Sequence, residues 1–291
     1  MTAPKITQAM IDAYDEYTHL TLDRRGFMEK LTKLAGSGAA AAAIAPLLAA
    51  NSAKAAIVAD NDARLKAEDI TYPGSTGEMK GYLVHPADQN GKLGTVIVIH
   101  ENRGLNPHIR DVARRVALEG FVALAPDFLS PLGGTPADED KARERFGRLD
   151  PAQTVANEVA TVAFLQGHEL GNGKVGAVGF CWGGGAVNDL AVASPDLAAA
   201  VAYYGRQPKP EDVPKITAPL LLHYAGLDDR TNAGIDAYKA ALDAAGKQYT
   251  VYVYDGVQHA FNNDTSEARY NKAAADLAWG RTIAFLKEKL A

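Results

Sequence analysis

The stretch Gly179-Phe180-Cys181-Trp182-Gly183 decides the fold of this 291-residue chain. It follows a buried-strand pattern over residues 174–178 and opens a helical pattern over residues 184–193. The flanking glycines suit a turn so tight that neighbouring Cβ atoms would collide. A nucleophile elbow holds its central residue in a strained conformation at such a turn, between a strand and a helix. The pattern therefore predicts Cys181 as a nucleophile, at a position where serine is usual.

Cys181 is also the only cysteine in the chain. Its place at a helix N-terminus favours the thiolate, because the helix dipole and free N–H groups stabilise negative charge there. One cysteine cannot form an intrachain disulfide, and the sequence has no Cys/His cluster at metal-ligand spacing. A redox role for the thiol is an alternative, but no second cysteine or C-x-x-C motif is present to resolve a disulfide.

Strand and helix patterns alternate along the rest of the chain. Continuous apolar runs such as Thr95-Val96-Ile97-Val98-Ile99-His100 indicate strands that are buried on both faces. We expect strands at 81–85, 95–100, 121–125, 174–178, 198–204, 219–224 and 248–254, and helices at 107–119, 137–148, 151–169, 184–193, 231–245 and 267–289. The alternation predicts an α/β fold with a mostly parallel central sheet and helices on both faces. Together with the elbow it predicts an α/β-hydrolase fold, formed by residues 56–291 as a single domain that begins with a polar lead-in and turns at 72–77.

A thiol nucleophile of this kind needs a base, and the base needs an acid that orients it. In this fold the acid and then the histidine follow the nucleophile along the chain. His259 lies in a loop just after a predicted strand, where open α/β sheets place their sites, whereas His223 lies inside a predicted strand. Asp228 is our preferred acid and Asp229 the alternative; either one is also suited to a turn or a helix N-cap.

The sequence resembles the dienelactone hydrolase (carboxymethylenebutenolidase) family from about residue 70 to the C-terminus. The resemblance rests on the elbow and on four further segments, in the same order and with similar spacing: Val96 to Glu101, Gly120 to Asp127, Tyr203-Tyr204-Gly205 and His259-Ala260-Phe261. It implies a triad of Cys181, Asp228 and His259, without a metal or organic cofactor. It also implies that Glu101 contacts the resting thiol and that the backbone N–H groups of Trp182 and Asn102 form an oxyanion hole, which suits acyl transfer.

The family holds its substrate carboxylate with arginines, and here the chain departs from the pattern. In the family, one of these arginines lies a few residues after the catalytic histidine. Here that stretch is His259-Ala260-Phe261-Asn262-Asn263 and contains no arginine. Arg143 and Arg145 lie where a second would be, and Arg103 and Arg206 are candidate replacements. Losing a bidentate carboxylate clamp should change specificity, so dienelactone itself is in question as the substrate. Tyr204 and Trp182 could line an apolar pocket.

The N-terminal 55 residues are expected to be an export leader. Asp23-Arg24-Arg25-Gly26-Phe27-Met28-Glu29-Lys30 is similar to a twin-arginine motif, residues 31–50 are apolar and rich in alanine, and Ala53-Lys54-Ala55 would supply a cleavage site. The expected location is the periplasm or outside the cell, with the twin-arginine export machinery as a partner. The alternative is a cytoplasmic protein with an amphipathic N-terminal helix. The apolar run is short, so no stable membrane span is expected.

Composition limits the remaining possibilities. Hydrophobic residues make up 47% of the chain, charged residues 22%, and the net charge is −5, so no basic surface favours nucleic acid or anionic lipid. The expected function is hydrolysis of an ester or lactone bond in a small substrate, which can be neutral or anionic. A thioesterase or general carboxylesterase is the first alternative, and a noncatalytic binding protein on the same fold is the second.

Overall fold

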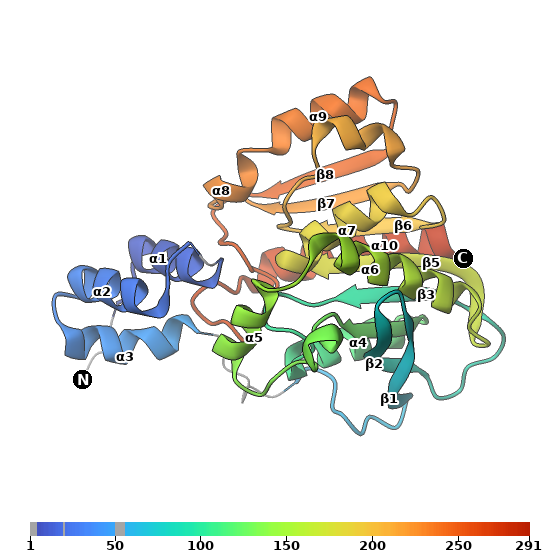
Figure 1. Cartoon of the computed structure of the whole chain (residues 1–291), viewed down its shortest axis with the longest axis horizontal. Coiled ribbons are helices and arrows are strands. Elements are labelled where there is room, and N and C mark those ends of the chain that lie inside the picture. Colours follow the sequence, from blue (N-terminus) through green and yellow to red (C-terminus); the bar gives the residue numbers. More distant parts are fainter. Residues whose placement is uncertain (1–4, 20, 50–55) are drawn as a thin grey trace.

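The computed structural model describes residues 5–19, 21–49 and 56–291. Eight strands form one sheet in the order β1-β2-β4-β3-β5-β6-β7-β8 (Figure 1). They are β1 (Leu65–Gly74), β2 (Gly77–Pro86), β3 (Leu93–Ile99), β4 (Val122–Asp127), β5 (Gly171–Phe180), β6 (Ala199–Tyr203), β7 (Leu220–Ala225) and β8 (Tyr249–Tyr254). Strands β3 to β8 pair in parallel, whereas β2 is antiparallel to both β1 and β4. The predicted mostly parallel sheet is therefore confirmed.

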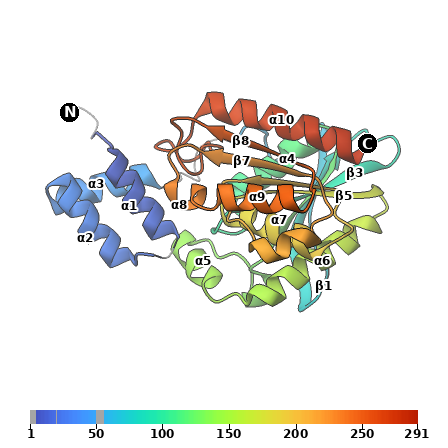
Figure 2. The same ribbon diagram turned by 90° about the horizontal axis from the view of Figure 1, so that it is seen from above.

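Helices cover both faces of the sheet, as predicted. One face packs against α4 (Pro107–Leu118) and α10 (Lys272–Leu290), the other against α6 (Pro151–Gln166), α7 (Trp182–Ala193) and α9 (Ile235–Ala244) (Figure 2). Side chains of a strand point alternately to the two faces. Along β3, Val96 and Val98 therefore join the first core, and Ile97 and Ile99 join the second. Strands that are buried on both faces are apolar throughout, which explains the continuous apolar runs.

Three elements differ from the sequence expectation. The polar lead-in contains β1, an edge strand whose side chains are mostly exposed, so it lacks an apolar pattern. The helix expected at 231–245 is divided into α8 (Asp229–Asn232) and α9. The last helix begins at Lys272 instead of residue 267, because the Asn271 side chain caps it by accepting from the backbone N–H of Ala274 at 3.0 Å.

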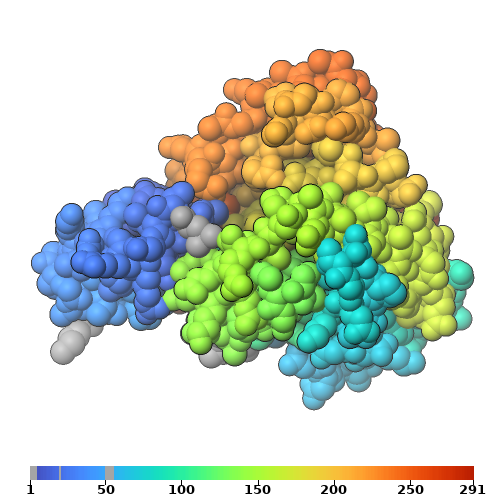
Figure 3. All heavy atoms as spheres, in the orientation of Figure 1, coloured from blue at the N-terminus to red at the C-terminus, as the bar shows by residue number. Residues whose placement is uncertain are grey.

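The expected leader contains three helices that pack together, which we call the N-terminal unit: α1 (Gln8–Thr18), α2 (Arg24–Ala35) and α3 (Gly38–Leu48). They share an apolar core that includes Tyr14, Phe27, Leu31 and Ile44. The unit lies beside α5 (Glu139–Phe146) and α8 (Figures 1 and 3). The predicted cleavage site at 53–55 falls outside the described residues.

Helices α2 and α3 correspond to the apolar part of the expected leader. Among the described residues, no single helix is both long and apolar enough to cross a membrane. The pair α2 and α3 would reach that length only together, and the chain bends by 113° between them. Gly36 sits at this bend with a φ of +80°, a conformation that favours glycine.

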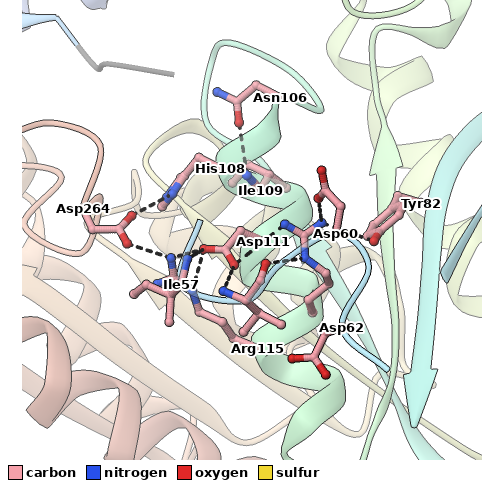
Figure 4. A network of polar contacts seen from close by, with 12 residues as sticks. Ile57, Asp60, Asp62, Tyr82, Asn106, His108, Ile109, Asp111, Arg115 and Asp264 are labelled. Atoms are coloured by element: carbon pink, nitrogen blue, oxygen red, sulfur yellow. Dashed lines mark hydrogen bonds and ion pairs between the residues drawn. The ribbon is translucent and has the colours of Figure 1, made fainter. Parts of the chain in front are cut away.

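A polar network fixes the loop after β8 to α4 (Figure 4). Asp264 of this loop pairs with His108 at 3.1 Å and with Arg115 at 2.7 Å, and both partners are on α4. Arg115 also bonds Asp111, which in turn accepts the backbone N–H of Ile57 at 3.1 Å. The same helix face therefore anchors the start of the α/β domain and the loop that carries His259.

Candidate active site

Cys181 sits between β5 and α7 in a strained conformation, with φ 56° and ψ −112°. Both glycines of the elbow are sterically required. A Cβ on Gly179 would lie 2.1 Å from the carbonyl oxygen of Gly183, and a Cβ on Gly183 would lie 2.4 Å from that of Ile99. The turn can therefore form only with the small residues of the quoted stretch, which agrees with the steric reason for the prediction.

His259 and Asp228 come together from two neighbouring strand ends. Asp228 follows β7, His259 follows β8, and Oδ2 of Asp228 lies 2.5 Å from Nδ1 of His259. Both side chains are buried. Burial raises the pKa of the Asp228 carboxyl, but the facing His259 and the hydrogen bonds to it outweigh burial and lower the pKa. The pair is thus a carboxylate that orients an imidazole. Within the part of the chain that the structure describes, Nε2 of His259 has no hydrogen-bond partner.

The two alternatives lie elsewhere. Asp229 is exposed at the start of α8. His223 is fully buried inside β7, where it bonds the Tyr254 hydroxyl at 2.9 Å and the Thr282 hydroxyl at 3.1 Å. Burial lowers the pKa of His223 to about 3, so it stays neutral in the core. Asp228 also caps α8 by accepting from the backbone N–H of Thr231 at 3.1 Å, so the cap and the pairing with His259 coexist.

A second histidine, which the sequence reasoning did not consider, faces the thiol. His19 follows α1, and its Nε2 lies 3.4 Å from Sγ of Cys181. The rings of His19 and His259 meet edge to face, with centroids 4.8 Å apart. Burial raises the pKa of the Cys181 thiol, but the facing His259 and His19 lower it to about 6. Among the described residues, these three form the one group whose donor atoms lie close enough to hold a single cation, within 4.8 Å of one another.

A cavity of about 380 Å³ opens in front of Cys181. Phe146, Leu149 and Trp182 give it an apolar wall, and Trp182 stacks on His100 with centroids 5.5 Å apart. Tyr204 and His259 line the side near the thiol, and their ring centroids are 4.9 Å apart. Thr18, at the end of α1, and His19, directly after it, also line the cavity.

The predicted oxyanion donors border this cavity. Trp182 is the first residue of α7, where backbone N–H groups lack intrahelical partners. Asn102 follows β3, and its side-chain amide donates to the carbonyl oxygen of Thr18. Glu101, next to it, is buried and accepts from the Asn263 amide at 2.7 Å. Burial raises the pKa of Glu101, but the positive charges around it, Arg103 foremost, lower the pKa below its usual value.

The four arginine candidates separate into two groups. Arg143 and Arg206 line the cavity. Arg143 lies over the ring of Tyr17 at 3.7 Å, whereas Arg206 pairs with Asp189. Arg103 and Arg145 are not among the residues that line it. Arg103 pairs with Glu139 at 3.1 Å and donates to the Tyr14 hydroxyl, and Arg145 donates to the carbonyl oxygen of Gly134.

The elbow, the buried acid–histidine pair and the mostly parallel sheet define an α/β-hydrolase. The model of the dienelactone hydrolase family matches residues 79–290. The chain belongs to the dienelactone hydrolase family, a family of hydrolases.

Three comparisons show the extent of the similarity. Over 113 residues the chain is 53% identical to the "Putative hydrolase fragment YghX" of Escherichia coli (strain K12), covering 38% of this chain and 97% of that one. Over 256 residues it is 32% identical to the "Putative carboxymethylenebutenolidase" of Escherichia coli O157:H7, and the match covers 82% of this chain and 93% of that one. The crystal structure of a "Putative Dienelactone Hydrolase" from Klebsiella pneumoniae superposes with a TM-score of 0.70 at 29% identity. The superposition covers 77% of this chain and 98% of that one.

Proposed function

We propose that this hydrolase cleaves an ester or lactone bond of a small substrate through a Cys181–His259–Asp228 triad. The observation that carries the proposal is the 2.5 Å contact between Asp228 and His259, with the Nε2 side of that imidazole near the thiol at the elbow. A buried base with an orienting carboxylate beside a thiol is the arrangement that nucleophilic catalysis needs.

The reaction begins with attack of the Cys181 thiolate on the carbonyl carbon. The carbonyl π electrons move to oxygen, and the backbone N–H groups of Trp182 and Asn102 stabilise the negative charge that develops. When the tetrahedral intermediate collapses, the C–O bond to the leaving group breaks, and His259 donates a proton to the departing oxygen. The product of this half is a thioester on Cys181.

Water completes the cycle. His259, now neutral, takes a proton from water, and the resulting hydroxide attacks the thioester carbonyl. Collapse of the second intermediate releases the carboxylic acid and restores the thiolate. Asp228 stays ionised throughout, since its role is to hold His259 in the useful tautomer and to stabilise the imidazolium.

The shape of the cavity favours a small acyl group with an apolar part. About 380 Å³ accommodates a compact substrate, and Phe146, Leu149 and Trp182 offer it an apolar surface. Arg143 places positive charge at the same cavity, whereas Arg206 is paired with Asp189, so Arg143 is the residue that favours an anionic substituent. Acyl thioesters and simple carboxylic esters share the reaction chemistry, so a thioesterase or general carboxylesterase is the alternative within this class.

The test is a substrate panel with the full-length protein and its Cys181→Ala variant. The panel contains activated esters, small lactones, dienelactone and acyl thioesters. We expect turnover by the native chain and its loss in the variant, whose unfolding transition should remain cooperative. Equal turnover by both proteins would eliminate the thiol mechanism, and the best substrate would rank the acyl classes.

We also propose export by the twin-arginine route, to the periplasm or beyond. The support is the motif at 23–30 and its accessibility, because the Arg24 and Arg25 side chains are 76% and 87% exposed on the folded chain. This route exports folded proteins, and in the folded chain the two arginines are accessible, whereas Phe27 of the same motif is buried. Cell fractionation with a change of both arginines to lysine tests it; an unchanged location would contradict export by this route.

A further inference from the structure

The N-terminal unit holds α1 against the active site through several specific contacts. Asp15 pairs with Arg269 at 3.0 Å, and the Tyr17 hydroxyl donates to Asp140 at 2.7 Å. The carbonyl oxygen of Thr18 accepts from the side chain of Asn102, a predicted oxyanion residue. Because these contacts surround the end of α1, they determine where the next residue, His19, lies.

The ring of His19 has a defined orientation. Its Nδ1 lies 2.7 Å from the carbonyl oxygen of Asp15, which can only accept, so Nδ1 carries a proton. Nε2 is therefore the atom presented to the cavity. It lies 3.4 Å from Sγ of Cys181 and 2.9 Å from a guanidinium nitrogen of Arg230, a side chain exposed to solvent.

Two imidazoles thus lie close to one sulfur atom. In His259, Nδ1 is bound by Asp228, and in His19, Nδ1 is bound by the Asp15 carbonyl, so each presents Nε2 to the thiol. Arg230 bonds His19, Arg103 and Tyr204 interact electrostatically with Cys181, and Glu101 interacts with Tyr204. The other charged residues that line the cavity are Arg143, Glu158, Asp189 and Arg206. Both histidines lower the pKa of the Cys181 thiol, and Nε2 of His19 lies within hydrogen-bond distance of its Sγ.

We propose that His19 is a further catalytic residue, which accepts the Cys181 proton at Nε2 and keeps the nucleophile as a thiolate before substrate binds. In this step the S–H bond breaks, its proton forms an N–H bond at Nε2 of His19, and the electron pair stays on sulfur. Arg230 then turns towards solvent, because a protonated Nε2 no longer accepts a hydrogen bond. His259 keeps its own proton for the leaving group.

This inference deepens the proposed function and rests on the thiol being its nucleophile. It gives His19 the contact with the thiol that the family resemblance implies for Glu101, whose carboxylate is bound by Asn263. It also makes the N-terminal unit part of the active enzyme, so the active chain keeps residues 8–48 in place. The proposed export and the proposed role of His19 are compatible if the N-terminal unit stays attached to the exported protein.

The test measures the state of the thiol directly. Alkylation of the full-length chain by iodoacetamide is followed against pH, since only the thiolate reacts. The native midpoint should lie at about 6. In His19→Gln and His19→Ala it should move to higher pH by about one unit, because one stabilising partner of the thiolate is lost. The same variants should then react about fivefold more slowly at pH 6, where about half of the native thiol but only about a tenth of the variant thiol is ionised.

The matched control is His168→Gln. His168 precedes β5 at the strand end opposite Cys181, about 30 Å away for a strand of this length, and should leave the midpoint unchanged. An unchanged midpoint in both His19 variants would overturn the inference. Ester turnover in the same samples separates the two proposals. A shifted midpoint without any turnover supports the role of His19 and contradicts the hydrolase, whereas turnover with an unshifted midpoint contradicts His19 alone.

Discussion

Asp228 binds His259 across the carboxyl ends of two adjacent strands, with 2.5 Å between Oδ2 and Nδ1. Residues 31 positions apart meet because parallel strands β7 and β8 end at the same edge of the sheet. Cys181 follows β5 at that edge as well. The site is therefore a consequence of sheet topology, as expected for open α/β sheets.

The Asp228 charge should be essential for turnover. Asp228→Asn keeps a side chain that caps α8 but removes the charge that orients and stabilises protonated His259. We expect kcat to fall by about 10³- to 10⁴-fold, with little change in stability. Asp229→Asn, which changes the exposed neighbour, is the matched control. The measurement is kcat with an activated ester at steady state. A comparable fall of kcat in both variants would contradict the assignment of Asp228 as the acid of the triad.

The pH profile of kcat/KM should be bell-shaped. The pKa of Cys181 is held at about 6, so the thiolate fraction and the rate should rise as pH increases through that value. Burial lowers the pKa of His259, but Asp228 and Cys181 raise it to about 10. The rate should therefore fall at alkaline pH, where His259 loses the proton that the leaving group needs. A rate independent of pH between about 5 and 7 would contradict a thiolate nucleophile.

The elbow should not tolerate a methyl group. Gly183→Ala places a Cβ 2.4 Å from a backbone oxygen, which cannot move without distorting β3. We expect the free energy of unfolding to fall by about 1–3 kcal/mol or more. Gly280→Ala is the control, because Gly280 lies in α10 with open space around it. That change should stabilise the chain by about 0.5–1 kcal/mol, and denaturant unfolding compares the two. Equal stability of both variants would show that the turn is not restrained as described.

Arg143 should discriminate between charged and neutral substrates. It lines the cavity, whereas Arg145, two residues along α5, does not. Arg143→Gln should raise KM about tenfold for esters that carry a carboxylate and leave neutral esters almost unchanged. Arg145→Gln should alter neither. The comparison needs one pair of substrates that differ only in that charge; a similar effect on both members of the pair would assign Arg143 to packing.

Much of this architecture is predictable from the sequence because it depends on local patterns. Strands buried on both faces are continuous apolar runs, and the elbow is defined sterically by Gly179 and Gly183. Strand β1 was not predicted, because the side chains of this edge strand are mostly exposed and form no apolar pattern. The pairing of Asp228 with His259 is predictable only through their order after Cys181 and their places at strand ends.

His19 could not be found in this way. The chain order of the fold directs attention to histidines after the nucleophile, and residue 19 lies within a segment that resembles a leader. Its approach to Cys181 depends on long-range contacts such as Asp15 with Arg269, 254 positions apart. Such contacts leave no periodic signal in the sequence, although the polar and aromatic residues of 12–19 are unusual for an export leader.

The most direct test of the central claim is detection of the acyl-enzyme. The full-length chain is mixed with an activated ester, quenched in acid within the first turnovers, and examined by intact-protein and peptide mass spectrometry. We predict a mass increase of one acyl group on the peptide that contains Cys181, with a longer lifetime in Asp228→Asn. Turnover without any acyl group on Cys181, or with an acyl group on another residue, would contradict the thiol mechanism.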